Sequence, residues 1–442
     1  MLRILMAENA PSLNKGEMTI VGGILYCLYS EFGSVQMAMF SDNPEIDKRR
    51  YDNIDIVDVD AAFGIASGFR KKSFINNLFA SMYCLAQHMI FIILYKINNN
   101  FSFKIMKSEI WKRYIESDVI LVGHDNAFLG SGFETPLFLY PIYLPMFAQL
   151  LRKKIVFFGG GFSISEPNKE KSLSFLKYII MISLKFSLIN MDMVTLRERI
   201  SFAYLKKIGF NDDQIRVTSD PAFLLQPENE KNVTEIMKIE NIYGINRPLI
   251  GLTITRKRAR MAYPNLSKSE SYDRHIRIIA DTVDNLISAL NASIIFIPHC
   301  IGFGDESDDR IVADDICKLC KNKEFIINIK NEYSPSELKG LIGHLDFFFG
   351  ERVHSVVNAM AMNVPSIILS DGKDVRLDIF KMAKQESAIC IIDELDSDEL
   401  FRKIYEIWIN RDRLRENLNR NIETVKTQSM LNAKMLKDLL EI

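Results

Sequence analysis

The pattern of the fold is clearest in the sequence FFFGERVHSVVNAMAMNVPSIIL, residues 347–369. It begins with a short apolar run, which is typical of a buried strand, and it ends with a second run of the same kind. Between the two runs, the residues that recur at helical spacing are Val356, Val357, Met360 and Ala361. The stretch therefore predicts a strand, a helix and a second strand, with Arg352 and His354 in the turn after the first strand. Open α/β sheets hold their ligands at such turns.

Strand-like runs alternate with helical patterns along the whole chain. In the first half these runs are residues 2–6, 35–40, 54–57, 119–122 and 155–158. In the second half they are residues 250–254, 294–297, 325–329, 345–349 and 366–369. This alternation predicts an α/β fold with parallel sheets and right-handed crossovers. We expect two Rossmann-like doubly wound domains facing a central cleft.

The length of 442 residues also favours two domains, because one hydrophobic core rarely extends over so long a chain. A polar stretch, QPENEKN, begins at Gln226, and Asn246-Arg247-Pro248 follows a short helical piece. We expect an N-terminal domain at 1–226, a linker at 227–248 and a C-terminal domain at 249–442.

The composition argues against several classes of protein. The 55 basic and 56 acidic residues nearly cancel, so a nucleic-acid partner is not expected. The six cysteines form no framework, and the N-terminus lacks a signal-peptide pattern, so we expect a cytoplasmic protein. Cys317 and Cys320 form a CxxC pair without a second pair or a nearby histidine. No metal site is expected from this spacing.

One segment leaves the relation to the membrane open. No charged residue lies between Lys72 and Lys96, and residues 73–95 are long enough to span a bilayer. The polar residues inside the segment are Asn76, Asn77, Ser81, Gln87 and His88. They favour a core helix, or a helix at the inner face of the membrane, over a true span.

Further candidate site residues follow other strands. Asn14, Gly16 and Glu17 open a helix after the first strand, where backbone amides and the helix dipole attract anions. An ordinary strand-to-helix turn explains them equally well. Asp125, beside His124, and His299, after the run 294–297, also follow strands. For both positions, a ligand contact and a simple loop residue remain open.

Together these elements resemble the polysaccharide pyruvyl transferase family, whose members resemble GT-B glycosyltransferases in having two Rossmann-like domains. The residues that carry the resemblance are Asn14 to Glu17, Arg197 to Ser201, Asp220 to Phe223, and Glu351 to Ser355 with Val364-Pro365 and Lys373. Glu17 stands where the family has aspartate, and Asn363 stands where it has glycine. The sequence after Lys373 departs from the family pattern.

The resemblance implies transfer of the enolpyruvyl carbons of phosphoenolpyruvate to a saccharide or lipid-linked saccharide, with formation of a pyruvate ketal and release of phosphate. No cofactor is implied. Arginine binds phosphate and carboxylate well, so Arg352 and Arg197 are the expected clamp on the donor. His354 is the expected acid. Lys373 would add charge over the leaving phosphate, and Ser355 belongs to the same substrate-binding segment.

Other interpretations remain open. Arg352 could instead pair with Asp346 or Glu351, and His354 could cap its helix. A glycosyltransferase using a nucleotide sugar would present Glu351 or Asp371 to a ribose. A non-catalytic scaffold of a polysaccharide assembly complex would dock through residues 73–95. For the acceptor, we expect contributions from Tyr263, Asn265, Tyr272 and the loop 302–309.

Overall fold

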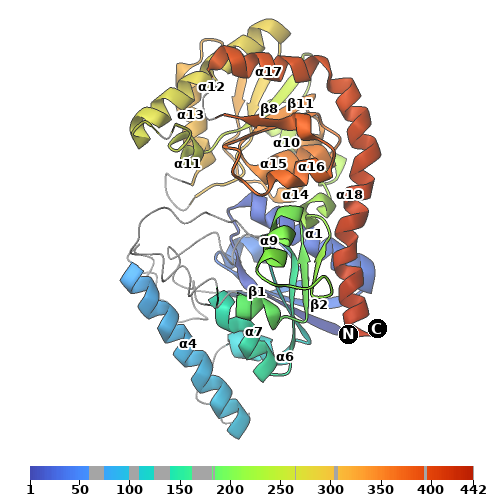
Figure 1. Cartoon of the computed structure of the whole chain (residues 1–442). Coiled ribbons are helices and arrows are strands. Elements are labelled where there is room, and N and C mark those ends of the chain that lie inside the picture. Colours follow the sequence, from blue (N-terminus) through green and yellow to red (C-terminus); the bar gives the residue numbers. More distant parts are fainter. Residues whose placement is uncertain are drawn as a thin grey trace. The chain divides into compact units, whose positions relative to one another are not determined.

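Two parallel sheets organise the chain (Figure 1). The computed structural model describes residues 1–58, 74–98, 109–123, 140–161, 182, 185–263, 265–302, 307–392 and 396–441. The strands of the first sheet are β1 (Leu2–Ala10), β2 (Val35–Ser41), β3 (Ile54–Asp58), β4 (Val119–Val122), β5 (Lys154–Gly160), β6 (Met193–Leu196) and β7 (Ile215–Val217). Those of the second sheet are β8 (Leu249–Thr253), β9 (Ser293–Phe296), β10 (Ile326–Asn328), β11 (Phe347–Gly350), β12 (Ser366–Ser370) and β13 (Ile389–Ile391).

Both sheets have the strand order of a doubly wound fold. The order is β3-β2-β1-β4-β5-β6-β7 in the first sheet and β10-β9-β8-β11-β12-β13 in the second. Each order reverses direction between two central strands, β1 and β4 or β8 and β11. Such a switch point opens a crevice at the carboxyl ends of the strands. The two Rossmann-like α/β sheets expected from the sequence are confirmed.

Helices connect successive strands. In the first half the described helices are α1 (Lys15–Phe32), α2 (Pro44–Arg50), α4 (Phe74–Ile97), α6 (Glu109–Glu116), α7 (Tyr140–Leu150) and α9 (Arg199–Lys207). Those that follow are η4 (Pro221–Leu224), α10 (Glu230–Ile239), α11 (Arg256–Ala259), α12 (Lys268–Leu290), α13 (Asp309–Leu319), η5 (Lys323–Phe325), α14 (Pro335–Gly343), α15 (Val353–Ala361), α16 (Leu377–Met382), η6 (Glu386–Ala388), α17 (Ser397–Ile409) and α18 (Arg411–Leu440).

The second sheet shows how the sequence builds these layers. All four residues of β11 and all five of β12 are buried, because helices cover both faces of a parallel sheet. On one face lies α12, whose first turn is closed by a capping box between Ser267 and Glu270 and whose last turn ends at Asn291 in the left-handed region. Its apolar side packs into the same core as the strands.

The chain forms two compact units whose boundaries differ from those of the expected domains. Each expected domain nevertheless contains one of the two sheets. The first unit comprises Met1–Ser12, Cys27–Asp220 and Ser429–Ile442, and the second comprises Leu13–Tyr26 and Pro221–Gln428. The segment 227–248, expected to be a linker, contains α10, which buries its apolar face and packs on α14 within the second unit. The first turns of α1 likewise belong to the unit of the second sheet.

Helix α4 occupies most of the uncharged segment and belongs to the first unit. One side of it is buried: the ring of His88 lies between Trp111, at 4.2 Å, and Phe147, at 5.4 Å between centroids. Phe91 stacks on Trp111 with centroids 4.4 Å apart. No helix in the described part of the chain is long and apolar enough to cross a membrane.

Candidate functional site

The candidate site lies at the switch point of the second sheet. Strands β8 and β11 pair side by side there, and β11 ends at Gly350, directly before Glu351 and Arg352. A Cβ atom at Gly350 would lie 2.9 Å from the carbonyl oxygen of Thr253, so the two strand ends approach too closely for a side chain. The structure thus places the turn with Arg352 and His354 in the expected crevice position of this sheet.

Glu351 fixes the geometry of this turn. Its side chain is buried and accepts hydrogen bonds from the amide of Thr255, at 2.8 Å, and pairs with Nε2 of His275, at 2.7 Å. These contacts join the end of β11 to the segment after β8 and to α12. Because both carboxylate oxygens have protein partners, Glu351 is not the partner of Arg352 that the sequence left open.

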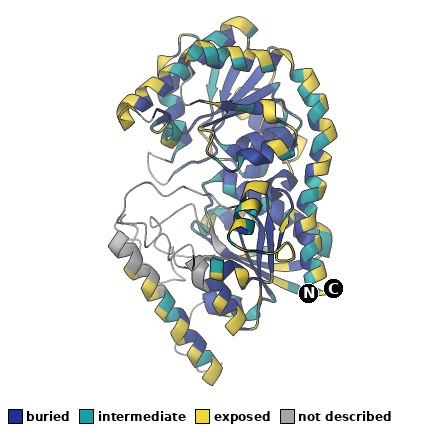
Figure 2. Cartoon of the chain, in the orientation of Figure 1, coloured by how far each residue is buried: buried dark blue, intermediate teal, exposed yellow. Residues whose placement is uncertain are grey.

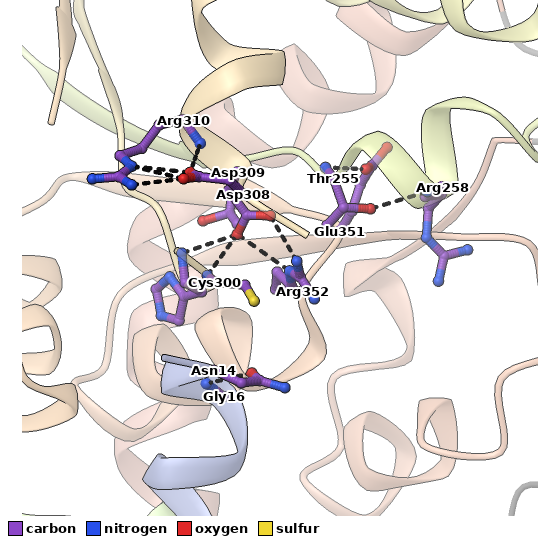
Figure 3. Close-up of polar contacts among 12 residues, drawn as sticks. Asn14, Gly16, Thr255, Arg258, Cys300, Asp308, Asp309, Arg310, Glu351 and Arg352 are labelled. Carbon is purple, nitrogen blue, oxygen red and sulfur yellow. Dashed lines mark hydrogen bonds and ion pairs between the residues drawn. The ribbon is translucent and has the colours of Figure 1, made fainter. Parts of the chain in front are cut away.

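Arg352 pairs with Asp309 instead (Figure 3). Its Nε and Nη2 atoms donate to the two carboxylate oxygens at 3.2 and 2.7 Å. Asp346, the other expected partner, accepts from the amide of Leu249 at 2.8 Å. Both sequence-based suggestions for the partner were therefore wrong. Among the described residues, none accepts a hydrogen bond from the third guanidinium nitrogen, Nη1, and 26% of the side chain is exposed.

The sequence analysis placed Asp309 only at the end of the loop 302–309 expected near the acceptor, and it missed the pairing with Arg352. Asp309 is the first residue of α13, and its carboxylate also accepts from the amides of His299 and Cys300, at 3.0 and 2.9 Å. Burial opposes the charged form of both partners. It raises the pKa of Asp309. For Arg352, burial by itself lowers the pKa, but the charge and hydrogen bonds of Asp309 together with the nearby Cys300 and Glu351 outweigh burial, so the pKa is raised. The only sequence signal was the pair Asp308-Asp309 before a helical pattern, which is also an ordinary helix start.

His354 is the second residue of α15 and is buried, with 4% of its surface exposed. It does not cap the helix, because Arg352 occupies the N-cap position. Ser355 closes the turn by donating from its hydroxyl to the carbonyl of Arg352 at 2.7 Å, and it is fully buried. A Cβ atom at Gly16 would lie 3.3 Å from Nδ1 of His354, so the imidazole rests against the first turn of α1.

The first turn of α1 completes this group of residues. Oδ1 of Asn14 accepts from the amide of Gly16 at 3.2 Å, and Nδ2 of Asn14 donates to Glu17 at 2.5 Å. The amide of Lys15 donates to the carbonyl of His299 at 2.7 Å. The turn is therefore docked on the loop after β9, and Figure 3 shows Asn14 and Gly16 on the side of Cys300 and Arg352.

His299 is fully buried beside these residues. Its Nδ1 lies 3.4 Å from the carbonyl oxygen of Ile297, and its Nε2 has no hydrogen-bond partner among the described residues. Burial lowers the pKa of His299 to about 3, and the charges of Arg352, His354 and Lys15 act in the same direction. At neutral pH the ring is therefore uncharged and can donate or accept a hydrogen bond.

Arg197 lies in the first unit. It is fully buried, and its Nη1 atom donates to Asp220, equally buried, at 3.2 Å. Glu198 caps α9 by accepting from the amide of Ser201 at 2.6 Å. Two of the sequence motifs thus meet in one buried ion pair, which favours a structural role for Arg197.

The remaining predicted residues have separate outcomes. Lys373 is exposed in the loop after β12, and its amide donates to Asp371 at 3.1 Å. Asp125 and the adjacent His124 lie outside the described residues. Tyr263 and Tyr272 are buried in the core of the second sheet, and their contact with the acceptor stays a prediction.

Potential metal-binding side chains are spread out in the described part of the chain. They contain no group of three or more histidine, cysteine, aspartate or glutamate side chains that could hold a metal ion. Burial raises the pKa of Cys317 to about 11 and that of Cys320 to about 12, which disfavours the thiolate form that binds metals.

A comparison with protein families shows to which family the chain belongs. A sequence model of the polysaccharide pyruvyl transferase family matches residues 28–372. The chain belongs to this family. The match includes the turn with Arg352 and His354, whereas the first turn of α1 and Lys373 lie beyond its two ends. In the search of curated proteins, none matches this pyruvyl transferase family member.

Solved structures similar to this family member share its fold. A UDP-GlcNAc 2-epimerase from Neisseria meningitidis bound to UDP-GlcNAc is 12% identical, with a TM-score of 0.57 and 99% of each chain covered. A glycosyltransferase from Rickettsia africae is 13% identical, with a TM-score of 0.55 and coverage of 99% and 98%. Anabaena HepE in complex with UDP is 9% identical, with a TM-score of 0.54 and full coverage of both chains. These likenesses confirm the expected GT-B-like fold class.

Proposed function

We propose that this family member transfers a pyruvyl group from phosphoenolpyruvate to a saccharide and forms a pyruvate ketal during surface polysaccharide biosynthesis. The observation that carries the proposal is the grouping of Arg352, His354 and the neutral His299 at the switch point of the second sheet. The first turn of α1 joins them there. Such a group offers fixed positive charge, neutral hydrogen bonding and a titratable acid in one place.

In the proposed complex, Arg352 binds the donor through the Nη1 side that Asp309 does not use. The guanidinium plane is held by two hydrogen bonds, so it needs little reorganisation when an anion arrives. The amino-terminal turns of α1 and α15 add partial positive charge from their backbone amides. Asn14, Gly16 and Glu17 would shape this pocket wall, and Ser355 would hold Arg352 in place through its carbonyl.

His354 is the proposed acid of the first step. Its imidazolium gives a proton to the methylene carbon of phosphoenolpyruvate, and the C=C electron pair forms the new C–H bond. The resulting oxocarbenium-like carbon is attacked by a first sugar hydroxyl, which loses its proton to the histidine. His299 would contribute a hydrogen bond, because a ring with a pKa of about 3 is not in the acidic imidazolium form at neutral pH.

The second step exchanges phosphate for the second hydroxyl. The C–O bond to phosphate breaks with both electrons going to the phosphate oxygen, and the second sugar hydroxyl forms its bond to the same carbon. The leaving phosphate takes up the proton that this second hydroxyl loses. Lys373 would stabilise the negative charge of the leaving group from its exposed loop. The reaction requires no cofactor.

The test is incubation of the purified protein with phosphoenolpyruvate and candidate glycans, with measurement of released phosphate and of product mass. We expect the glycan to gain one pyruvate and lose one water. In cells that lack the protein, the pyruvate ketal should disappear while the sugar composition of the glycan stays the same.

A second candidate is glycosyl transfer from a nucleotide sugar. The similar structures in complex with UDP-GlcNAc and UDP support it, since they share the fold. Thermal shift measurements separate the two candidates: stabilisation by phosphoenolpyruvate favours pyruvyl transfer, and stabilisation by nucleotide sugars favours glycosyl transfer. A scaffold without catalysis would leave the glycan of a His354→Gln strain unchanged.

A further inference from the structure

Helix α4 has an apolar stripe that faces solvent. The exposed large apolar side chains on it are Phe79, Met82, Tyr83, Met89, Ile90, Ile93 and Ile97. Separations of three, four and seven residues, as from Phe79 to Tyr83, Tyr83 to Ile90 and Ile90 to Ile93 to Ile97, place them on one side of the helix. More than half of the surface of Ile90 and Ile93 is exposed, at 51% and 54%. Figure 2 shows exposed residues along much of the described part of α4.

The opposite side of α4 is already used within its own unit. His88, Phe91 and Ile92 are buried there, where they belong to or contact the core that includes Trp111 and Phe147. The helix is therefore anchored to the first sheet's unit by one face, while the exposed stripe has no part in that core. Contiguous exposed apolar surface of this kind is rare in isolated globular units and marks an interaction site.

The charges around the stripe indicate which kind of surface it meets. No acidic residue occurs between Asp60 and Glu109. The basic residues in the same interval are Arg70, Lys71, Lys72, Lys96, Lys104 and Lys107. Three of them precede α4 in the sequence, Lys96 lies in its last turn and two follow it, in a chain whose net charge is only −1. A protein partner with an ordinary mixed surface does not require this exclusion of carboxylates, whereas an anionic lipid surface does.

We propose that the exposed stripe of α4 docks this protein on an anionic membrane surface, with the helix in the plane of the interface. The apolar side chains enter the boundary between headgroups and acyl chains, and the excess of positive charge in this part of the sequence, which includes Lys96 in the last turn of α4, attracts anionic headgroups. The buried face of α4 keeps its contacts with α6 and α7 in this arrangement. Docking would hold the enzyme near acceptors attached to lipids.

The proposal can be tested by co-sedimentation of the full-length protein with vesicles. We expect binding to vesicles of phosphatidylcholine mixed with phosphatidylglycerol, and about tenfold weaker binding to phosphatidylcholine alone. The double substitution Ile90→Asn and Ile93→Asn should weaken binding to the mixed vesicles by about tenfold or more. A variant with Ile90→Lys and Ile93→Lys should bind the mixed vesicles more weakly than the wild type but more tightly than the Asn double variant. It loses apolar area but gains attraction to the anionic headgroups.

The matched control is Ile409→Asn, since Ile409 is also 60% exposed but lies at the end of α17 in the second unit. It should bind vesicles like the wild type, and all variants should keep the wild-type melting temperature. Equal vesicle binding by the Asn double variant would overturn the proposal. So would a solution dimer that the double variant loses while neither protein binds vesicles. Turnover of a soluble acceptor is independent of docking, so this test does not depend on the proposed chemistry.

Discussion

Arg352 and Asp309, which are 43 residues apart in the chain, form an ion pair through two parallel hydrogen bonds. The same carboxylate accepts hydrogen bonds from the amides of His299 and Cys300, so it connects the loop after β9 to the turn after β11. The guanidinium that the sequence marks as an anion clamp is therefore held in one orientation. Asp309, which the sequence did not single out as a partner of Arg352, determines where the Nη1 side of the guanidinium points.

Replacement of Asp309 by asparagine should lower catalytic efficiency with phosphoenolpyruvate by about tenfold to a hundredfold, equivalent to roughly 1.4–2.8 kcal/mol. An amide can keep one hydrogen bond to Arg352 but loses the charge that aligns the guanidinium. This loss should come mainly from a higher KM for phosphoenolpyruvate, measured by phosphate release. Asp308→Asn is the matched control, because Asp308 pairs with Arg310. Equal losses in both variants would contradict the role of Asp309.

Replacement of His354 by glutamine should reduce kcat by about a hundredfold or more, because an amide cannot deliver a proton to carbon. Binding of phosphoenolpyruvate should change little, since Arg352 remains in place. Both quantities are accessible from steady-state kinetics and thermal shift. His344→Gln, at the partly exposed end of α14, serves as control and should retain activity. Retained turnover in His354→Gln would remove the histidine from the mechanism.

Stability should fall on mild acidification because of His299. The folded ring gains a proton only near pH 3, whereas in the unfolded chain it does so near 6.5. Between these values the unfolded state binds more protons, so lowering the pH through this window favours unfolding, by up to about 1.4 kcal/mol per pH unit. The free energy of unfolding, measured with urea between about pH 7 and about pH 5, should depend less steeply on pH in His299→Leu than in the wild type. Parallel curves would mean that the buried ring does not titrate as inferred.

Removal of the charge of Asp220 should destabilise the first unit strongly. Asp220→Asn removes the carboxylate that pairs with the buried guanidinium of Arg197, at a cost of about 3–5 kcal/mol. Asp212→Asn removes the carboxylate of an exposed pair with Lys206 and should cost less than about 1 kcal/mol. Urea unfolding curves measure both. A stable Asp220→Asn protein with weakened donor binding would instead restore Arg197 to the substrate site.

Several parts of this fold and site are readable from the chain because they are local. The apolar runs and their helical intervals predict ten of the thirteen described strands, and they miss β6, β7 and β13. The position of a residue just after a strand predicts its place at the carboxyl edge. Arg352, His354 and His299 were found in this way, and the structure places them in one unit. Gly16 and Asn14 were found from their turn, which also depends on neighbours in sequence.

The carboxylate that pairs with Arg352 could not be predicted from local sequence patterns. Asp309 rather than Glu351 faces Arg352 because α13 begins where the loop after β9 returns to the switch point, and Glu351 is already held by Thr255 and His275. No pattern in the chain encodes that choice, since it depends on which of several carboxylates the packing brings within reach.

Periodicity and turn residues depend on atoms a few positions apart, so the amino-acid order alone was enough for the two doubly wound sheets and for the location of the arginine and histidine. Burial and pairing depend on segments that are tens to hundreds of residues apart, such as Arg197 with Asp220 and Gly16 with His354. Folding in three dimensions was needed to join the first turns of α1 to the second sheet's unit and to withdraw Arg197 into an ion pair. It also left one apolar side of α4 in solvent, although the sequence is apolar on both.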